Sequence, residues 1–118
     1  MGERGGTGAE IRIIGAELAD GLELRTLGLA ARGRPELRVS GLAPYLGQGW
    51  ARVVAVLAQR LAALDGAIPA ELDLAPEVTV GLVTNEGDLV PVPPAGFTGP
   101  AGDWRRDVLL ALFPSAHS

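Results

Sequence analysis

Residues 43–66 read APYLGQGWARVVAVLAQRLAALDG, and this stretch predicts the most regular element of the chain. Pro44 fixes a backbone φ that suits the start of a helix. Apolar residues then recur every three or four positions, which is the spacing of one helix face. They are Leu46, Trp50, Val53, Val54, Leu57, Leu61 and Leu64. We expect a helix that buries Trp50 against a sheet and ends at Asp65-Gly66, where glycine suits a left-handed cap.

Short segments that alternate apolar and polar residues lie on both sides of this helix and predict strands. The predicted strands are residues 10–14, 22–26, 37–40, 78–84 and 89–92. The predicted reversals are residues 19–21, 32–36 and 85–88. Pro91 lacks a backbone N–H, so the last strand is expected at a sheet edge. Residues 67–76 are predicted as a loop, and Asp103 as the N-cap of a closing helix that reaches Phe113.

This element order, βββαββα, predicts an α+β fold. We expect a two-layer sandwich, with a mainly antiparallel sheet of about five strands and two helices on one face. Residues 1–8 are Gly-rich and predict a flexible lead, whereas residues 9–118 are expected to form a single domain.

The residue types that the chain lacks argue against several kinds of catalysis and metal binding. All ten basic residues are arginine, there is no cysteine, and the single histidine is His117. Schiff-base chemistry, the P-loop lysine, thiolate nucleophiles and cysteine-ligated metals all need residues that the chain lacks. We therefore expect no metal, no organic cofactor and no catalytic residues, although the sequence alone leaves enzymatic activity open.

Charge and hydropathy argue against two classes of partner, nucleic acids and membranes. The formal net charge is −4 and no basic stripe is present, which argues against nucleic-acid binding. No apolar run reaches the roughly 18 residues of a membrane span, and residues 1–6 match neither a signal peptide nor a myristoylation motif. We expect a cytoplasmic protein without a membrane partner. The arginine-only, Ala/Gly/Leu-rich composition indicates a GC-rich bacterial genome.

One sequence pattern resembles small bacterial domains that have no characterised activity. It consists of Thr26-Leu27-Gly28-Leu29, then Gly33-Arg34-Pro35-Glu36-Leu37, then Gly41-Leu42 before a helix. The resemblance covers about residues 22–64 and implies an α+β fold, without an activity to carry over. Gly33 and Pro35 also suit a tight reversal on physical grounds.

Acidic residues provide the candidate polar chemistry. Asp20 and Asp88 lie in the two predicted hairpin turns and would form a carboxylate pair if those turns met at one end of the sheet. Around Trp104, charged residues open the closing helix. Together with the single tyrosine they define a candidate ligand pocket in a helix–sheet cleft, formed by Tyr45, Asp103, Arg106 and Asp107.

The closing helix is apolar on nearly every side, and a helix of this kind is normally buried. A monomer with one sheet and two helices would leave part of this helix exposed to solvent. We therefore expect a homodimer or a partner protein to cover the exposed apolar surface. The candidate interface residues are Val108, Leu109, Leu110, Leu112 and Phe113. The sequence thus favours a non-catalytic protein-interaction module of accessory or immunity type. The alternative is a small-molecule-binding protein, or a small enzyme that uses carboxylate and arginine chemistry in the candidate pocket.

Overall fold

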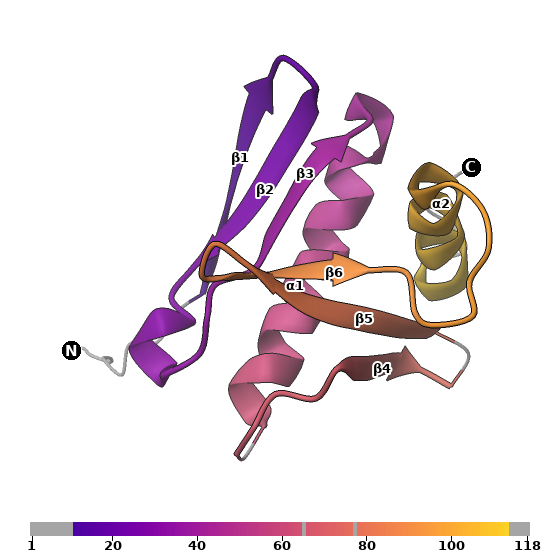
Figure 1. Ribbon diagram of the computed structural model, residues 1–118. Helices are drawn as coiled ribbons and strands as arrows, with labels where there is room; N and C mark the ends of the chain where they lie inside the picture. The colour runs from indigo at the N-terminus through magenta and orange to yellow at the C-terminus, as the bar shows by residue number, and fades with distance from the viewer. Residues whose placement is uncertain (1–10, 65, 77, 114–118) are drawn as a thin grey trace.

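The computed structural model describes residues 11–64, 66–76 and 78–113; the predicted flexible lead and His117 lie outside them. Within these ranges the chain forms strands and helices in the order βββαβββα, with two short 3-10 helices, η2 and η3 (Figure 1). The elements are β1 (Arg12–Leu18), β2 (Gly21–Leu27), η2 (Ala30–Arg32), β3 (Arg38–Leu42), η3 (Pro44–Leu46), α1 (Gly47–Ala63), β4 (Glu71–Ala75), β5 (Val78–Asn85), β6 (Asp88–Val92) and α2 (Ala101–Leu112).

The strands form two antiparallel sheets, ordered β1-β2-β3 and β4-β5-β6. An isolated parallel bridge between Leu37 and Leu89 connects them, and the Leu89 N–H donates to the Glu36 carbonyl at 2.8 Å. The α+β class is therefore confirmed. The single sheet of about five strands and the two-layer arrangement with both helices on one face are not confirmed, because β4 adds a strand and the strands divide into two sheets.

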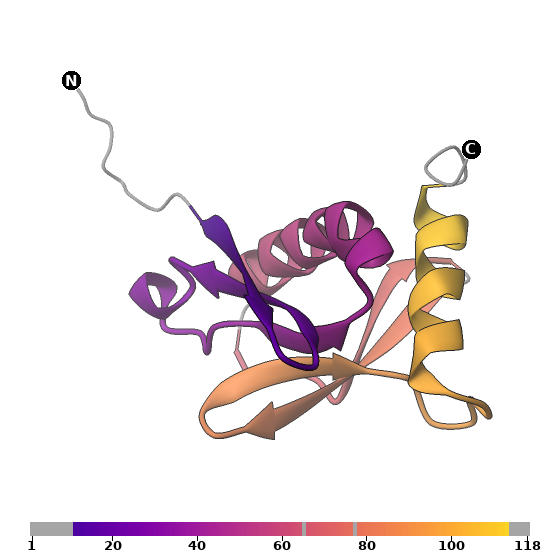
Figure 2. The same cartoon turned by 90° about the horizontal axis from the view of Figure 1, so that it is seen from above.

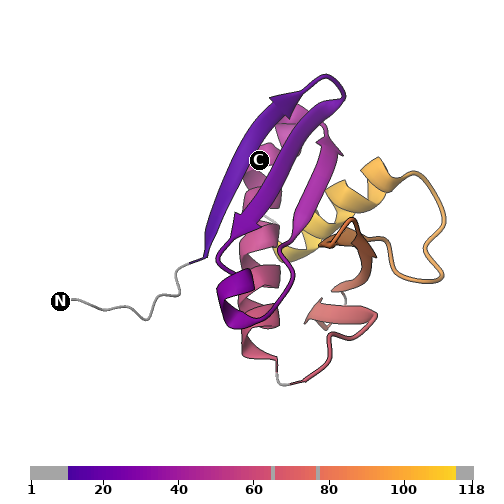
Figure 3. The ribbon, with the colours of Figure 1, turned by 60° about the vertical axis from the view of Figure 1, so that its left-hand side comes forward.

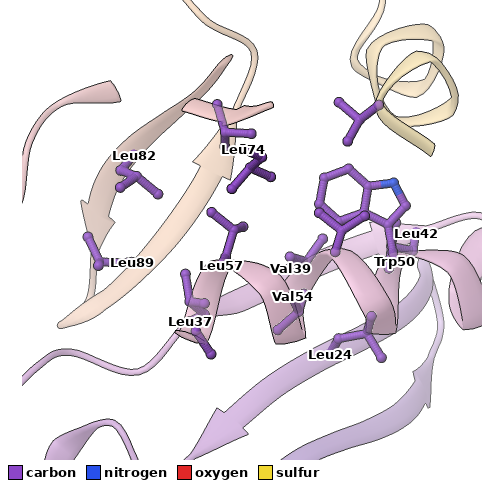
Figure 4. Close-up of a cluster of buried hydrophobic side chains, with 14 of the residues drawn as sticks. Leu24, Leu37, Val39, Leu42, Trp50, Val54, Leu57, Leu74, Leu82 and Leu89 are labelled. Carbon is purple, nitrogen blue, oxygen red and sulfur yellow. The ribbon is translucent and has the colours of Figure 1, made fainter. Parts of the chain in front are cut away.

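The hydrophobic core lies between α1 and the two sheets. In Figure 1, β1 to β3 run alongside α1, β5 and β6 cross it, and β4 lies beside β5. Figure 4 shows Leu57 of α1 in the same buried cluster as Val39 of the first sheet and Leu82 of the second. The apolar face predicted from the sequence is the buried one, and Trp50 is fully buried, as expected.

The end of α1 differs from the prediction. The helix stops at Ala63, and Leu64 takes an extended conformation before Gly66, whose φ is 86°. The Arg34 guanidinium donates hydrogen bonds to the carbonyl oxygens of Leu64 and Gly66, the latter at 2.6 Å. An arginine 30 residues earlier in the chain therefore satisfies carbonyl groups of the C-cap and of the segment that follows the helix.

Two of the predicted strand assignments need correction. β1 begins and ends later than residues 10–14, and its seven residues pair with β2 without a register shift. Residues 67–76 are not all loop, since Glu71–Ala75 form β4. The alternation of Glu71-Leu72-Asp73-Leu74 did signal this strand, but Pro69 and Pro76 on either side favoured a loop. Pro91 does lie in a strand at the end of its sheet order, as predicted.

The closing helix, α2, starts earlier than predicted. Its N-cap is Pro100 and not Asp103, which lies in the first turn and pairs with Arg106 at 3.2 Å. Figure 2 shows α2 standing at a steep angle to α1, beside the second sheet. The two helices meet through Trp50 and Trp104, whose ring centroids lie 5.5 Å apart.

Candidate functional site

The position of α2 is fixed by polar contacts as well as by the two indole rings. The Trp50 Nε1–H donates to the Arg105 carbonyl at 3.0 Å. The Arg105 guanidinium donates to the carbonyl oxygens of Ser40 at 2.9 Å and Gly41 at 3.0 Å, at the end of β3. Burial lowers the pKa of Arg105 from its usual value. These contacts hold α2 in place and leave a hollow on each of its flanks.

The first hollow, which we call the Tyr45 hollow, has a volume of about 370 Å³ and lies between η3, the start of α1 and α2. It is lined by Tyr45, Leu46, Gly49, Arg106, Leu109, Leu110 and Phe113. Tyr45 is 73% exposed and Leu110 is 37% exposed. Gly49 permits the close approach of the helices, because a Cβ there would lie 2.7 Å from Cδ1 of Leu109. The Tyr45 hollow is therefore mainly apolar and open to solvent.

One arginine lines the Tyr45 hollow, and a second contacts the Phe113 ring that also lines it. Arg106 lines it and is paired with Asp103, and both side chains are about half exposed. The Arg52 guanidinium carbon lies 5.7 Å from the centre of the Phe113 ring, within the range of a cation–π contact. An apolar group that also carries a carboxylate would match these surroundings, because it could bury its apolar part and reach an arginine.

The predicted pocket residues divide between two places. Tyr45 and Arg106 line the same hollow, and Asp103 is bound to Arg106. Asp107 lies on the other flank of α2, where it lines a second hollow of about 380 Å³ with Val78, Phe97 and other residues. The four predicted residues therefore do not form one site.

The predicted interface residues of α2 are also divided. Val108 and Leu109 are buried in the core of the chain, whereas Leu112 and Phe113 are half-buried. Leu110 is exposed at the Tyr45 hollow. The protein's own core thus covers much of the helix that the sequence suggested would need a partner, and the accessible apolar part is centred on Leu110.

The proposed carboxylate pair does not form. Asp20 lies near the end of β3, where its Oδ2 would be 4.0 Å from a Cβ added at Gly41. Asp88, the first residue of β6, lies beside the start of β3, with its Oδ2 3.5 Å from Nε of Arg38. The two hairpin turns are therefore at opposite ends of β3. In the described ranges, no three His, Cys, Asp or Glu residues are grouped so that they could hold a metal ion.

Sequence reasoning missed a polar cluster around Glu36. Its carboxylate accepts hydrogen bonds from the Thr26 hydroxyl at 2.7 Å and from the backbone N–H groups of Gly28, Leu29 and Ala30 at 3.0 to 3.2 Å. Burial alone would raise the pKa of Glu36, but these hydrogen bonds outweigh it and hold the pKa below its usual value. The cluster fixes the loop between β2 and β3, so we assign it a structural role.

Comparisons with known proteins add no relative: no family model matches the chain, and neither the curated proteins nor the solved structures gave a match. None of the helices in the described part of the chain is long and apolar enough to cross a membrane.

Proposed function

We propose that the chain is a non-catalytic protein-interaction module that self-associates or binds a partner protein, and that a second copy of the chain is the partner its surface favours. One observation carries the proposal. Among the residues that the structure describes, five of the six exposed large hydrophobic side chains belong to two surfaces: Ile14, Leu18 and Leu27 on β1 and β2, and Tyr45 and Leu110 at the Tyr45 hollow. Grouped exposed apolar side chains are characteristic of association surfaces.

The use of the charged side chains supports a non-catalytic role. Glu36 closes the β2–β3 loop, and arginines such as Arg34, Arg60 and Arg105 donate to backbone carbonyl groups. Charged groups that hold the fold in this way are unavailable for proton transfer to a substrate. The net charge of −4 supports a protein partner over a nucleic acid. A bacterial origin and a cytoplasmic location, without a membrane partner, remain part of this proposal.

The mass of the protein in solution tests self-association. We expect light scattering at micromolar concentrations to give more than the 12.1 kDa of one chain, with a mass that falls on dilution. Leu27→Lys and Leu110→Glu each place a charge on one of the two surfaces and should show which of them takes part. A mass of one chain at every concentration tested would contradict self-association.

A second candidate function is the binding of an apolar carboxylate in the Tyr45 hollow. It is favoured by one observation, namely that Tyr45 and Arg106 line the same apolar hollow. The probe is phenylacetate, with benzyl alcohol as a matched compound that lacks the carboxylate. If this function is correct, phenylacetate shifts the amide NMR signals of the lining residues and Arg106→Gln weakens its binding. Equal binding of the two compounds would contradict a role for the arginine.

A further inference from the structure

Most outer edges of the two sheets are covered by other parts of the chain. At β4, Arg60 donates to the carbonyl oxygens of Asp73 at 3.2 Å and Leu74 at 3.3 Å. At β3, Arg105 donates to those of Ser40 and Gly41. β6 receives the parallel bridge from residue 37 and contains a proline, which cannot donate. Covering arginines and prolines are standard means of preventing a sheet edge from pairing with another chain.

The outer edge of β1 has no such cover. In the ranges that the structure describes, no backbone or side-chain group bonds to β1 from beyond β2. Figure 3 shows β1 on the outside of the molecule, with no helix or strand past it. β1 contains no proline and pairs with β2 over seven residues without a bulge, whereas the pairings of β2 with β3 and of β4 with β5 both contain a register shift. β1 is thus a regular, unprotected edge strand.

The outer face of β1 has a self-complementary sequence. Its residues Arg12, Ile14, Ala16 and Leu18 lie on the face away from the core, because the β2 residues opposite the first two, Leu27 and Arg25, are exposed. Ile14 is 45% exposed and Leu18 is 48% exposed. The order along this face is therefore basic, apolar, small, apolar, and the acidic Asp20 follows in the turn.

We propose that β1 pairs antiparallel with β1 of a second copy, across a two-fold axis at Ala16, so that the two β1-β2-β3 sheets become one continuous sheet. In this register Ile14 lies opposite Leu18 of the second copy, and the pair occurs twice. The inference rests on the self-association proposed above and assigns it to β1 and not to the Tyr45 hollow.

Charge favours this antiparallel direction. β1 starts with the basic Arg12, and the acidic residues Glu17 and Asp20 lie near its end and in the turn that follows. Antiparallel pairing brings the basic start of each copy near the acidic end of the other, whereas parallel pairing would place the Arg12 side chains of the two copies together. Opposite charges across strands stabilise a sheet, and like charges destabilise it.

Space for side chains of the incoming strand is present on the inner side of the edge. A hollow of about 420 Å³ lies between β1 and the first turns of α1, and its lining includes Gly15, Glu17, Gln48 and Ala51. In the proposed register, Glu17 of the second copy lies opposite Gly15, which has no side chain to obstruct it. Backbone pairing along an edge, with room for alternate side chains, is a recurrent mode of strand addition.

Three variants test the register. Ile14→Lys and Leu18→Glu each place a charge opposite an apolar side chain, so each should raise the dimer dissociation constant at least about tenfold. The double variant I14K/L18E places a lysine opposite a glutamate at both pairs and should recover most of the affinity. Val83→Lys is the control, since Val83 is equally exposed, at 47%, but lies in the second sheet. Sedimentation velocity at a series of concentrations measures these four variants and the wild type.

Cross-linking tests the two-fold axis directly. The chain has no cysteine, so Ala16→Cys introduces a single thiol at the proposed axis. Opposed residues in an antiparallel pair have Cα separations of about 4.5 to 5.5 Å, which a disulfide can span. Mild oxidation should therefore convert Ala16→Cys rapidly to a covalent dimer, and Leu27→Cys, on the neighbouring strand, slowly.

The outcomes separate this inference from the proposed function. The register is correct if wild type is dimeric, both single variants dissociate and the double variant dimerises again. If the dimer survives Ile14→Lys but is lost in Leu110→Glu, self-association stands and pairing through β1 is wrong. If the double variant dimerises as weakly as the single variants, the register is wrong. A wild type that remains monomeric overturns both self-association and pairing through β1.

Discussion

The hydroxyl of Thr26 donates a hydrogen bond to the Glu36 carboxylate at 2.7 Å and accepts one from the Leu37 N–H at 2.8 Å. Thr26 is fully buried at the end of β2, and Glu36 precedes β3. The same carboxylate binds the backbone N–H groups of the intervening loop, up to the first residue of η2. One glutamate and one threonine therefore set the path between the two strands.

The lowered pKa of Glu36 predicts a pH-dependent contribution to stability. An unfolded glutamate has a pKa of about 4.3. Because the folded pKa is lower, the stabilisation is fully present above the unfolded value and is lost as the pH falls through the folded one. We expect Glu36→Gln to lower the free energy of unfolding by about 1–3 kcal/mol at pH 7, with a difference that shrinks in acid. Urea unfolding from neutral to acid pH measures it.

Glu86→Gln is the matched control for Glu36→Gln. Glu86 lies in the β5–β6 turn with a side chain that is 79% exposed, 3.8 Å from Arg38. An ion pair this exposed contributes less than about 1 kcal/mol. A Glu36→Gln effect no larger than that of Glu86→Gln, or one that does not change with pH, would contradict the role assigned to the Glu36 carboxylate.

Thr26→Val should destabilise the protein without changing its volume much. The substitution leaves the Leu37 N–H without its buried partner and removes one donor from Glu36. We expect a loss of about 1–3 kcal/mol in the free energy of unfolding, measured by urea titration. Thr79→Val is the comparison, because the Thr79 hydroxyl bonds to Asp73 in an exposed position. Equal losses in both variants would show that burial of the Thr26 hydroxyl is unimportant.

Gly21 and Gly33 should respond differently to alanine. Both have a positive φ, of 132° and 78°, so alanine is strained at each. At Gly21 the new Cβ would also lie 2.6 Å from the Leu42 carbonyl oxygen, whereas nothing lies within 4 Å at Gly33. We expect Gly33→Ala to cost about 1–2 kcal/mol and Gly21→Ala distinctly more, as measured by thermal unfolding. The reverse order would mean that β2 and β3 are not as close at this turn as the structure has them.

Local patterns predicted the elements that depend on them. The apolar spacing around Trp50 predicted α1, and a Glu86-Gly87 turn between alternating residues fits the hairpin of β5 and β6, where both turn residues have positive φ. Contacts between distant residues were not predictable in this way. Arg34 and Arg60 reach carbonyl groups that lie 30 and 13 residues away, and no spacing rule in the sequence marks either pair.

The candidate site was predicted only in part, because it also depends on contacts between distant residues. Tyr45 and Arg106 lie at one hollow because α2 packs near the start of α1, which the sequence did not show. Asp107 follows Arg106 directly in a helix, so the two side chains diverge by about 100° around the axis and cannot face one hollow. For β1 a usable signal was present: Ile14, Ala16 and Leu18 alternate with other residues and continue the strand beyond its predicted end.

Trp50 should be the side chain on which the packing of both helices most depends. It is fully buried, its ring meets Trp104 and its Nε1–H donates to the Arg105 carbonyl at 3.0 Å. Trp50→Ala removes all three contributions, and large-to-small changes of buried aromatics cost about 3–5 kcal/mol, a large share of the roughly 5–15 kcal/mol that stabilises a domain. Trp50→Phe keeps much of the apolar burial but leaves the Arg105 carbonyl without this donor, so its cost should be smaller yet measurable by urea unfolding. Tyr45→Ala, at a position that is 73% exposed, should change stability by less than about 0.5 kcal/mol. If Trp50→Ala unfolded at the same urea concentration as Tyr45→Ala, the packing of α2 against α1 would have to be wrong.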